Sequence, residues 1–186
     1  MLKNSNNVKE QIRTELLQQR RSVNKETCQT ISTKICEQLK SIVNEKSPTT
    51  IVGYNAFDNE IDLTNLYNWI LTETNIHLYF PKYINKNYAC VHIQALSDLT
   101  IGKHSILEPK ENTPILTKTT QNILWLVPGI AFDKQHNRLG FGQGIYDRLL
   151  SQYTGYKIGI GYTFQVITQL PTEDHDIKMD MILTSD

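Results

Sequence analysis

The sequence of 186 residues has no surplus of charge, few cysteines and no long apolar run. Its 19 basic and 19 acidic side chains cancel, whereas nucleic-acid binding needs a surplus of Lys and Arg on one face. No stretch approaches the roughly 18–20 apolar residues that cross a bilayer. The polar start, Met1–Glu10, lacks the apolar segment of a signal peptide. We therefore expect no nucleic-acid partner and no membrane partner.

The three cysteines, Cys28, Cys36 and Cys90, have neither the paired spacing of a metal site nor the pattern of a disulfide framework. We expect reduced thiols and a cytoplasmic location. A hydrophobic content of 39% is ordinary for a globular protein, and the length suits one domain with a sizeable core. The sequence thus predicts a single domain over residues 1–186, which we expect to be a monomer.

Hydrophobic periodicity predicts alternating helices and strands. Helical patterns cover about residues 8–21 and 25–43 and the segment after Asp62, which can cap its helix. Strand patterns cover residues 51–57, 76–80, 88–95, 123–127, 157–161 and 180–184. Residues 100–121 are polar and contain prolines, so we predict a long loop with little regular structure there. The fold class is α/β, a single-domain layered sandwich with a mostly parallel central sheet flanked by helices.

Residues 137–148, read as NRLGFGQGIYDR, form the most informative segment. Three alternating glycines follow a predicted strand and precede a helical pattern that we expect to reach Tyr153. Glycines let a backbone approach an anion closely, and a helix start offers unpaired N–H groups. Arginines pair with phosphate oxygens, and Asp147 is a hard oxygen ligand suited to Mg²⁺. The alternative is a tight turn that only feeds a helix.

Several short motifs together resemble the 5-formyltetrahydrofolate cyclo-ligases, also called methenyltetrahydrofolate synthetases. The resemblance runs nearly from end to end, and the order and separation of the motifs make it specific. The matching segments are Lys9-x-x-x-Arg13, Asn59–Asp62, Phe80–Tyr83, Leu107–Pro109, Val127–Asp133, Asn137–Gly140, Gly142–Arg148 and His175–Thr184.

The resemblance implies ATP-driven closure of 5-formyltetrahydrofolate to 5,10-methenyltetrahydrofolate, with Mg²⁺ as cofactor and ATP as co-substrate. It places Arg138 and Asp147 in the catalytic role, Asn55, Glu60 and Tyr146 on the folate, and Asp147 and Asp180 on the metal. The ATP-binding residues that it implies are Lys9, Arg13, Arg138, Leu139, Gly140, Phe141, Gly142, Gln143, Gly144, Ile145 and Tyr146.

Each of these roles has a plain structural alternative. Asp147 could only stabilise a helix start, which contributes about 0.3–1 kcal/mol. Arg138 could form a surface pair with Asp133, worth at most about 1 kcal/mol. Lys9 and Arg13 could be a solvated helix face, Glu60 an exposed turn residue, and Asp180 a turn residue before a strand. Tyr146 could belong to the core.

The sequence departs from the family pattern at Phe141, Gln143 and Ile145, which puts individual substrate contacts in doubt but not the class of reaction. The alternative function is a phosphate-ligand-binding protein or an isomerase on a related α/β fold, without ATP-driven chemistry. An ATP requirement distinguishes the two hypotheses.

Overall fold

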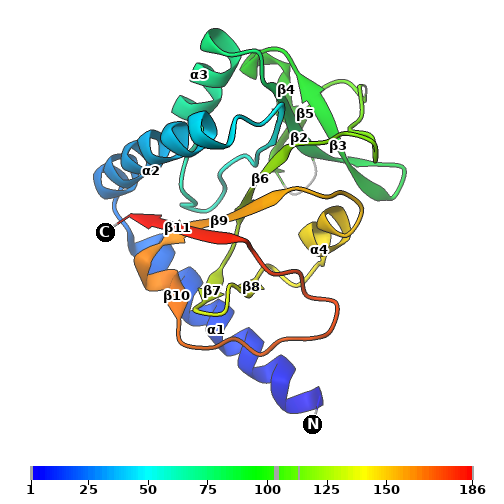
Figure 1. The fold of residues 1–186 in the computed structure, drawn as a ribbon. Coiled ribbons are helices and arrows are strands. Elements are labelled where there is room, and N and C mark those ends of the chain that lie inside the picture. Colours follow the sequence, from blue (N-terminus) through cyan, green and yellow to red (C-terminus); the bar gives the residue numbers. More distant parts are fainter. Residues whose placement is uncertain (1, 103–104, 113, 186) are drawn as a thin grey trace.

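The computed structural model describes residues 2–102, 105–112 and 114–185, with side chains from Asn6 onward. A central six-stranded sheet runs in the order β11-β9-β6-β1-β2-β3. Its first five strands are parallel, and the edge strand β3 is antiparallel to β2. Helices flank this sheet (Figure 1), so the predicted α/β sandwich is confirmed.

The bounds of the elements are as follows. The helices are α1 (Leu2–Ser22), α2 (Lys25–Lys46), α3 (Thr64–Glu73), α4 (Ile145–Leu150) and the short 3₁₀ turns η1 (Leu96–Asp98) and η3 (Thr163–Gln165). The central strands are β1 (Thr50–Val52), β2 (His77–Ile84), β3 (Asn87–Ile93), β6 (Ile123–Pro128), β9 (Tyr156–Tyr162) and β11 (Met181–Ser185). The smaller sheets contain β4 (Leu99–Ile101), β5 (Leu107–Pro109), β7 (Ala131–Asp133), β8 (Arg138–Leu139) and β10 (Val166–Ile167).

The central sheet is buried on both faces, as strand β6 illustrates. Leu124 and Leu126 face a core made with α2 and α3, whereas Trp125 and Val127 face a second core made with α4. Successive side chains of a strand point to opposite faces, so a strand covered on both sides is apolar throughout. In the described part of the chain, no helix is long and apolar enough to cross a membrane.

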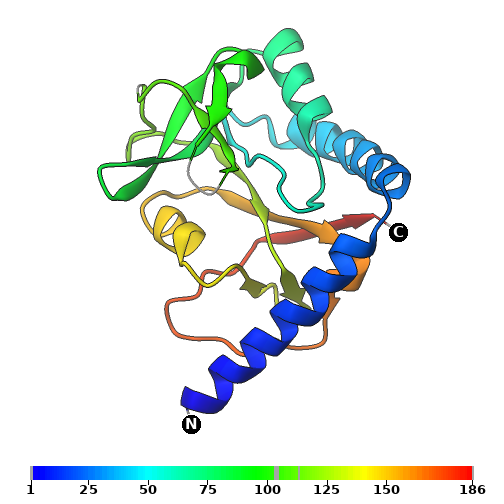
Figure 2. The same ribbon diagram turned by 180° about the vertical axis from the view of Figure 1, so that it is seen from behind.

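Helix α1 lies apart from α2 and α3, alongside the small sheet β10-β7-β8 (Figure 2). Leu16 of this helix is buried against Ile130, Ala131, Leu139 and Leu170. This contact places the half of α1 that contains Leu16 beside the segment that follows β6. Side chains of α1 thereby reach the segment that carries the glycine loop.

One predicted strand is shorter in the structure, and one predicted loop contains a short strand pair. Strand β1 ends at Val52 instead of residue 57, because the Tyr67 hydroxyl accepts a hydrogen bond from the Tyr54 N–H and donates one to the Tyr54 carbonyl. The Tyr67 side chain thus forms the hydrogen bonds with the Tyr54 backbone that a neighbouring strand would otherwise form. Residues 100–121 contain the short antiparallel pair β4–β5, and most of the other described residues there lie outside helices and strands, as predicted.

The loop between β7 and β8 is organised by Asp133, a fully buried carboxylate. Its two oxygens accept four hydrogen bonds of 2.9 Å, from the N–H groups of Gln135, Asn137 and Leu170 and from the Asn137 side chain. Burial alone would raise the pKa of Asp133, but these hydrogen bonds outweigh it and lower the pKa. The carboxylate is therefore held ionised.

Replacing Asp133 with asparagine is expected to lower the free energy of unfolding by about 3 kcal/mol, because one acceptor becomes a donor that faces other buried donors. Thermal unfolding measures this, with the exposed Asp174→Asn as control. The stabilisation should be present above the unfolded-state pKa of 3.8 and lost as the pH falls through the lower folded value. Equal melting temperatures for the two variants would contradict this role.

Candidate active site

A cavity of about 590 Å³ opens where the strand order of the central sheet reverses. From β1 the chain continues to β2 on one side, and from β6 to β9 on the other. In open α/β sheets, ligands bind at such a switch point, outside the carboxyl ends of the strands. The turn after β1 and the glycine loop after β6 both line the cavity. The structure therefore brings the two predicted motifs together.

Of the predicted site residues, all but one line this cavity. Those that do are Lys9, Arg13, Asn55, Glu60, Arg138, Leu139, Gly140, Phe141, Gly142, Gln143, Gly144, Ile145, Tyr146 and Asp147.

The exception is Asp180, which is not among the described residues of the cavity wall. It lies just before β11, where its carboxylate accepts hydrogen bonds from the Lys157 backbone N–H at 2.7 Å and from its ammonium at 3.0 Å. These contacts join β9 to β11. The structure thus gives Asp180 a contact with Lys157 and leaves it outside the described cavity wall.

The glycine loop is shaped by two arginines that pack against it. A side chain on Gly140 would lie 2.6 Å from a terminal nitrogen of Arg138, and one on Gly142 would lie 3.3 Å from Arg13. The Arg13 Nε donates to the Gly140 carbonyl at 2.9 Å. Gly142 has a φ of 86°, a conformation that side chains disfavour. Glycine thus lets two guanidinium groups approach the backbone.

The backbone of the loop remains available to a ligand. Within the described ranges, the N–H groups of residues 141–144 donate to no acceptor of the protein. Helix α4 has six residues and ends at Leu150, short of the predicted Tyr153. A short helix contributes little dipole, so the loop amides and the arginines supply most of the positive potential for an anion.

Arg138 and Asp147 face each other across the loop. The Arg138 Nη2 lies 3.1 Å from the Asp147 Oδ2, and the two side chains are 5% and 20% exposed. The guanidinium also lies over the Tyr146 ring, 5.3 Å from its centroid. The alternative prediction, that Arg138 forms a surface pair with Asp133, is wrong, because the Arg138 side chain is buried and pairs with Asp147. Among the described groups, the Arg138 Nε has no hydrogen-bond partner.

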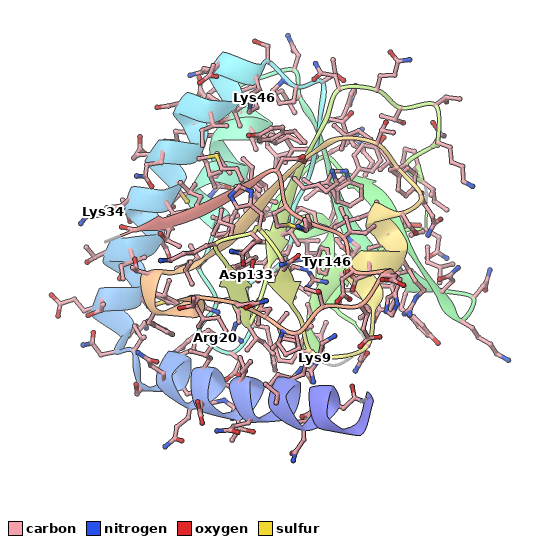
Figure 3. The ribbon with its side chains drawn as sticks, turned by 60° about the horizontal axis from the view of Figure 1, so that its bottom comes forward. Lys9, Arg20, Lys34, Lys46, Asp133 and Tyr146 are labelled. Carbon is pink, nitrogen blue, oxygen red and sulfur yellow. The ribbon has the colours of Figure 1, made fainter. Side chains whose placement is uncertain are left out.

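Lys9 and Arg20 both extend from α1 toward the end of the sheet (Figure 3). The Lys9 ammonium lies 2.9 Å from Glu173 and 3.5 Å from Asp176, two carboxylates of the segment before β11. Its side chain is only 10% exposed, so Lys9 is not part of a solvated helix face. It is a cation in the cavity wall.

Glu60 is a buried part of the cavity wall, with 9% of its surface exposed. Burial raises the pKa of Glu60 to about 7, against the opposing effects of Arg20 and of the Phe57 N–H. That N–H donates to Oε2 at 3.2 Å. The exposed-turn alternative for Glu60 is therefore wrong. Burial also raises the pKa of Tyr146, so its hydroxyl keeps its proton and stays a hydrogen-bond donor.

Asn55 is held by a neighbouring strand, and further wall residues occupy positions to which the sequence assigned no contact. Asn55, which we expected at the folate, donates to the Leu107 carbonyl at 2.7 Å and joins β5 to the turn after β1. The additional lining residues are Asn6, Glu10, Tyr54, Phe57, Pro81, Tyr88, Ile106, Leu107, Glu108, Pro128, Gly129, Glu173, His175 and Asp176. Many of them lie in or beside the motifs that resemble the family, so those motifs were the sequence feature that could have identified them.

The donor set fits a magnesium ion that arrives with phosphate. No group of three His, Cys, Asp or Glu suited to a metal occurs in the part of the chain that is described. Magnesium, however, uses one or two carboxylates, with substrate phosphates and water completing its shell. Asp147 offers one partly exposed carboxylate beside the anion-binding loop. An ion held mainly by the nucleotide would need no more.

Comparison with known proteins gives one consistent family. A family model described as "5-formyltetrahydrofolate cyclo-ligase family" matches residues 5–185. The chain is 27% identical to the 5-formyltetrahydrofolate cyclo-ligase of Haemophilus influenzae, over 94% of this chain and 96% of that protein. It is 29% identical to the Mycoplasma pneumoniae enzyme of the same name, over 96% and 99%.

Solved structures agree with the sequence comparisons. The 5,10-methenyltetrahydrofolate synthetase of Aquifex aeolicus aligns with a TM-score of 0.84 and 33% identity, covering 95% of this chain and 89% of that one. The synthetase of Mycoplasma pneumoniae aligns with a TM-score of 0.76 and 26% identity, over 94% and 96%. Because the family model matches residues 5–185, nearly the whole of the chain, the chain belongs to the 5-formyltetrahydrofolate cyclo-ligase family.

Proposed function

We propose that this protein catalyses the ATP- and Mg²⁺-dependent cyclisation of 5-formyltetrahydrofolate to 5,10-methenyltetrahydrofolate, with release of ADP and phosphate. The observation that carries the proposal is the shared cavity, in which a cationic glycine loop and a buried carboxylate face the same space. The first is suited to a triphosphate and the second to the N–H donors of a pterin. Family membership supports the same assignment.

The chemical difficulty is that a formamide carbon is a poor electrophile and its oxygen a poor leaving group. Transfer of the γ-phosphoryl group to the formyl oxygen breaks a P–O bond of ATP and releases ADP. N10 of the same folate then attacks the activated carbon and loses its proton, and the C–O bond breaks as phosphate departs. Because both reacting groups belong to one molecule, a folded substrate gives a high effective concentration.

The protein's task is to align the reactants and balance charge. Arg138, Arg13 and Lys9 would face the phosphates together with the N–H groups of residues 141–144. Magnesium bound to the phosphates and Asp147 would supply additional positive charge. Glu60 would accept from the pterin, and the Tyr146 hydroxyl would donate to the folate between the two ends. Asn55 would act on the folate site through its hydrogen bond to the Leu107 carbonyl.

Replacing Arg138 with alanine is expected to raise the KM for ATP about 10- to 100-fold, since hydrogen bonds to charged groups are worth about 1.5–3 kcal/mol. The melting temperature should also fall, because the Arg138 side chain is buried against Asp147. Steady-state kinetics with Arg148→Ala as control measure the first effect; Arg148 is exposed and follows the same loop. A lower melting temperature with an unchanged KM for ATP would show a purely structural role.

The proposal extends to the remaining expectations from the sequence. It describes a single-domain, cytoplasmic monomer that acts on small molecules and binds neither nucleic acid nor membrane. The three cysteines, all free, support a reducing compartment. Counting ADP and methenyl product in one reaction tests the chemistry: equal amounts are expected. A phosphate-binding protein or an isomerase that works without ATP would form no ADP, whether or not it formed a product.

A further inference from the structure

Arg20 is an almost completely buried arginine near the end of α1, with 1% of its side chain exposed. Its Nε donates to the Asp58 carbonyl at 2.9 Å, and its Nη1 to the Gly129 carbonyl at 3.3 Å. The same Nη1 lies 3.5 Å from the Glu60 Oε1. Its Nη2 has no hydrogen-bond partner among the described groups, but it lies 3.9 Å from the Asp58 Oδ2, within ion-pair distance. A buried guanidinium is costly unless it is paired, which indicates a purpose beyond packing.

These contacts join the turn that carries Glu60 to the chain that follows β6. Asp58 and Glu60 lie in the turn after β1, and Gly129 follows β6 across the switch point. The Arg20 Cζ also lies 5.8 Å from the centroid of the Phe141 ring in the glycine loop, within the range of a cation–π contact. One side chain thus joins α1 to both walls of the site.

Arg20 opposes the effect of burial on the charge of Glu60. The charged and titratable groups that act on it are Arg20 from α1, Asp58 in its own turn, Tyr54 after β1 and Tyr146 of α4. Arg20 is the cation of this set. Burial has the largest effect on the pKa of Glu60 and raises it, whereas Arg20 lowers it. An ionised carboxylate only accepts hydrogen bonds, as two-point recognition of pterin N–H groups requires.

We infer that Arg20 is the positioning residue of the folate site: through its 3.5 Å contact it holds the Glu60 carboxyl fixed against the cavity, and it acts on the substrate only through that group. The inference rests on the proposed function, because it takes Glu60 as the pterin anchor. It assigns a role to a residue of α1 that lies outside the Lys9–Arg13 motif. It also predicts that folate recognition, and not nucleotide binding, depends on the end of this helix.

The test compares Arg20→Met with Arg21→Met in steady-state kinetics over a range of pH. Arg21 is a matched control, since it neighbours Arg20 and binds Asp58 at 2.8 Å but has a 61% exposed side chain. Arg20→Met should raise the KM for 5-formyltetrahydrofolate roughly 10- to 100-fold, the effect of one charged hydrogen bond, with the KM for ATP changed less than about twofold. Arg21→Met should leave both near the wild-type values.

The pH profile separates positioning from general damage. Removing the cation raises the pKa of Glu60, so its ionised fraction at a given pH falls. The KM for folate should therefore recover at higher pH in Arg20→Met. Arg20→Lys, which keeps the charge but not the planar fork, should retain the wild-type pH dependence with an intermediate KM for folate. In a Glu60→Gln background, Arg20→Met should add little.

The outcomes are distinguishable from failure of the proposed function. Wild-type protein without turnover would remove the function itself. Active wild type with the same KM for folate in Arg20→Met as in Arg21→Met would overturn the inference. Should Arg20→Met not fold, Arg20→Lys decides the question. A selective rise in its KM for folate supports the inference, and an equal rise in both KM values, or none, contradicts it.

Discussion

Replacing Asp147 with asparagine is expected to reduce kcat by about 100-fold or more, the usual loss when one group that stabilises transition-state charge is removed. The fold should remain, with an unchanged circular-dichroism spectrum. Asparagine keeps the size of the side chain and its place at the start of α4 but removes the charge that Mg²⁺ requires. The activity should therefore need a higher Mg²⁺ concentration.

Two other roles for Asp147 give different results in the same experiment. If Asp147 only stabilises the helix start, the variant loses under about 1 kcal/mol of stability and keeps near-normal activity. If it only orients Arg138, from which it lies 3.1 Å, the KM for ATP rises and the Mg²⁺ requirement is unchanged. Activity is measured against Mg²⁺ concentration for wild type and variant. Superimposable curves after scaling would exclude the metal role.

Replacing Glu60 with glutamine is expected to weaken 5-formyltetrahydrofolate binding about 100-fold, because a buried site that loses one of two matched acceptors leaves polar groups unpaired. One carboxylate oxygen becomes an NH₂ donor that faces a pterin N–H. Nucleotide affinity should stay within about twofold of wild type, since Glu60 belongs to the turn after β1 and not to the glycine loop. Calorimetric titration with each ligand measures both values. Unchanged folate affinity would remove Glu60 from the site.

The same substitution should change how stability depends on pH. Burial raises the pKa of Glu60 from 4.5 to about 7, so its contribution to stability is fully present below pH 4.5 and is lost as the pH rises through 7. Between pH 5 and pH 8 the wild type should lose about 2–3 kcal/mol relative to Glu60→Gln, from the size of the shift. Chemical unfolding of both proteins at the two pH values measures this. A difference in unfolding free energy between the two proteins that is the same at both pH values would contradict a raised pKa for the buried Glu60.

Local sequence patterns predicted those parts of the fold and site that depend on local chemistry. The glycine loop could be recognised because Gly140, Gly142 and Gly144 alternate beside two arginines. The strands of the parallel sheet could be recognised because they are apolar on both faces. Glu60 and the loop were expected in one cleft because both follow strand ends. The structure confirms the sheet and places the two segments around one cavity.

The features that the sequence did not reveal depend on contacts between distant segments. Arg20 is 38 residues from Asp58, so nothing in the local pattern of α1 shows that this arginine is buried and Arg21 is not. Strand β1 ends early because of Tyr67, a residue of the following helix. The Asp180 carboxylate forms an ion pair with Lys157 of a neighbouring strand. Such pairings follow from the topology, which spacing along the chain does not encode.

The central claim is tested most directly by mixing purified protein with 5-formyltetrahydrofolate, ATP and Mg²⁺ and recording the absorbance of the methenyl product. Omission of ATP, and separately of Mg²⁺ in the presence of a chelator, provides the controls. The account predicts that the product appears only in the complete mixture, with one ADP for each molecule formed. Folded protein that gives no methenyl product, or gives it equally without ATP, would contradict the account.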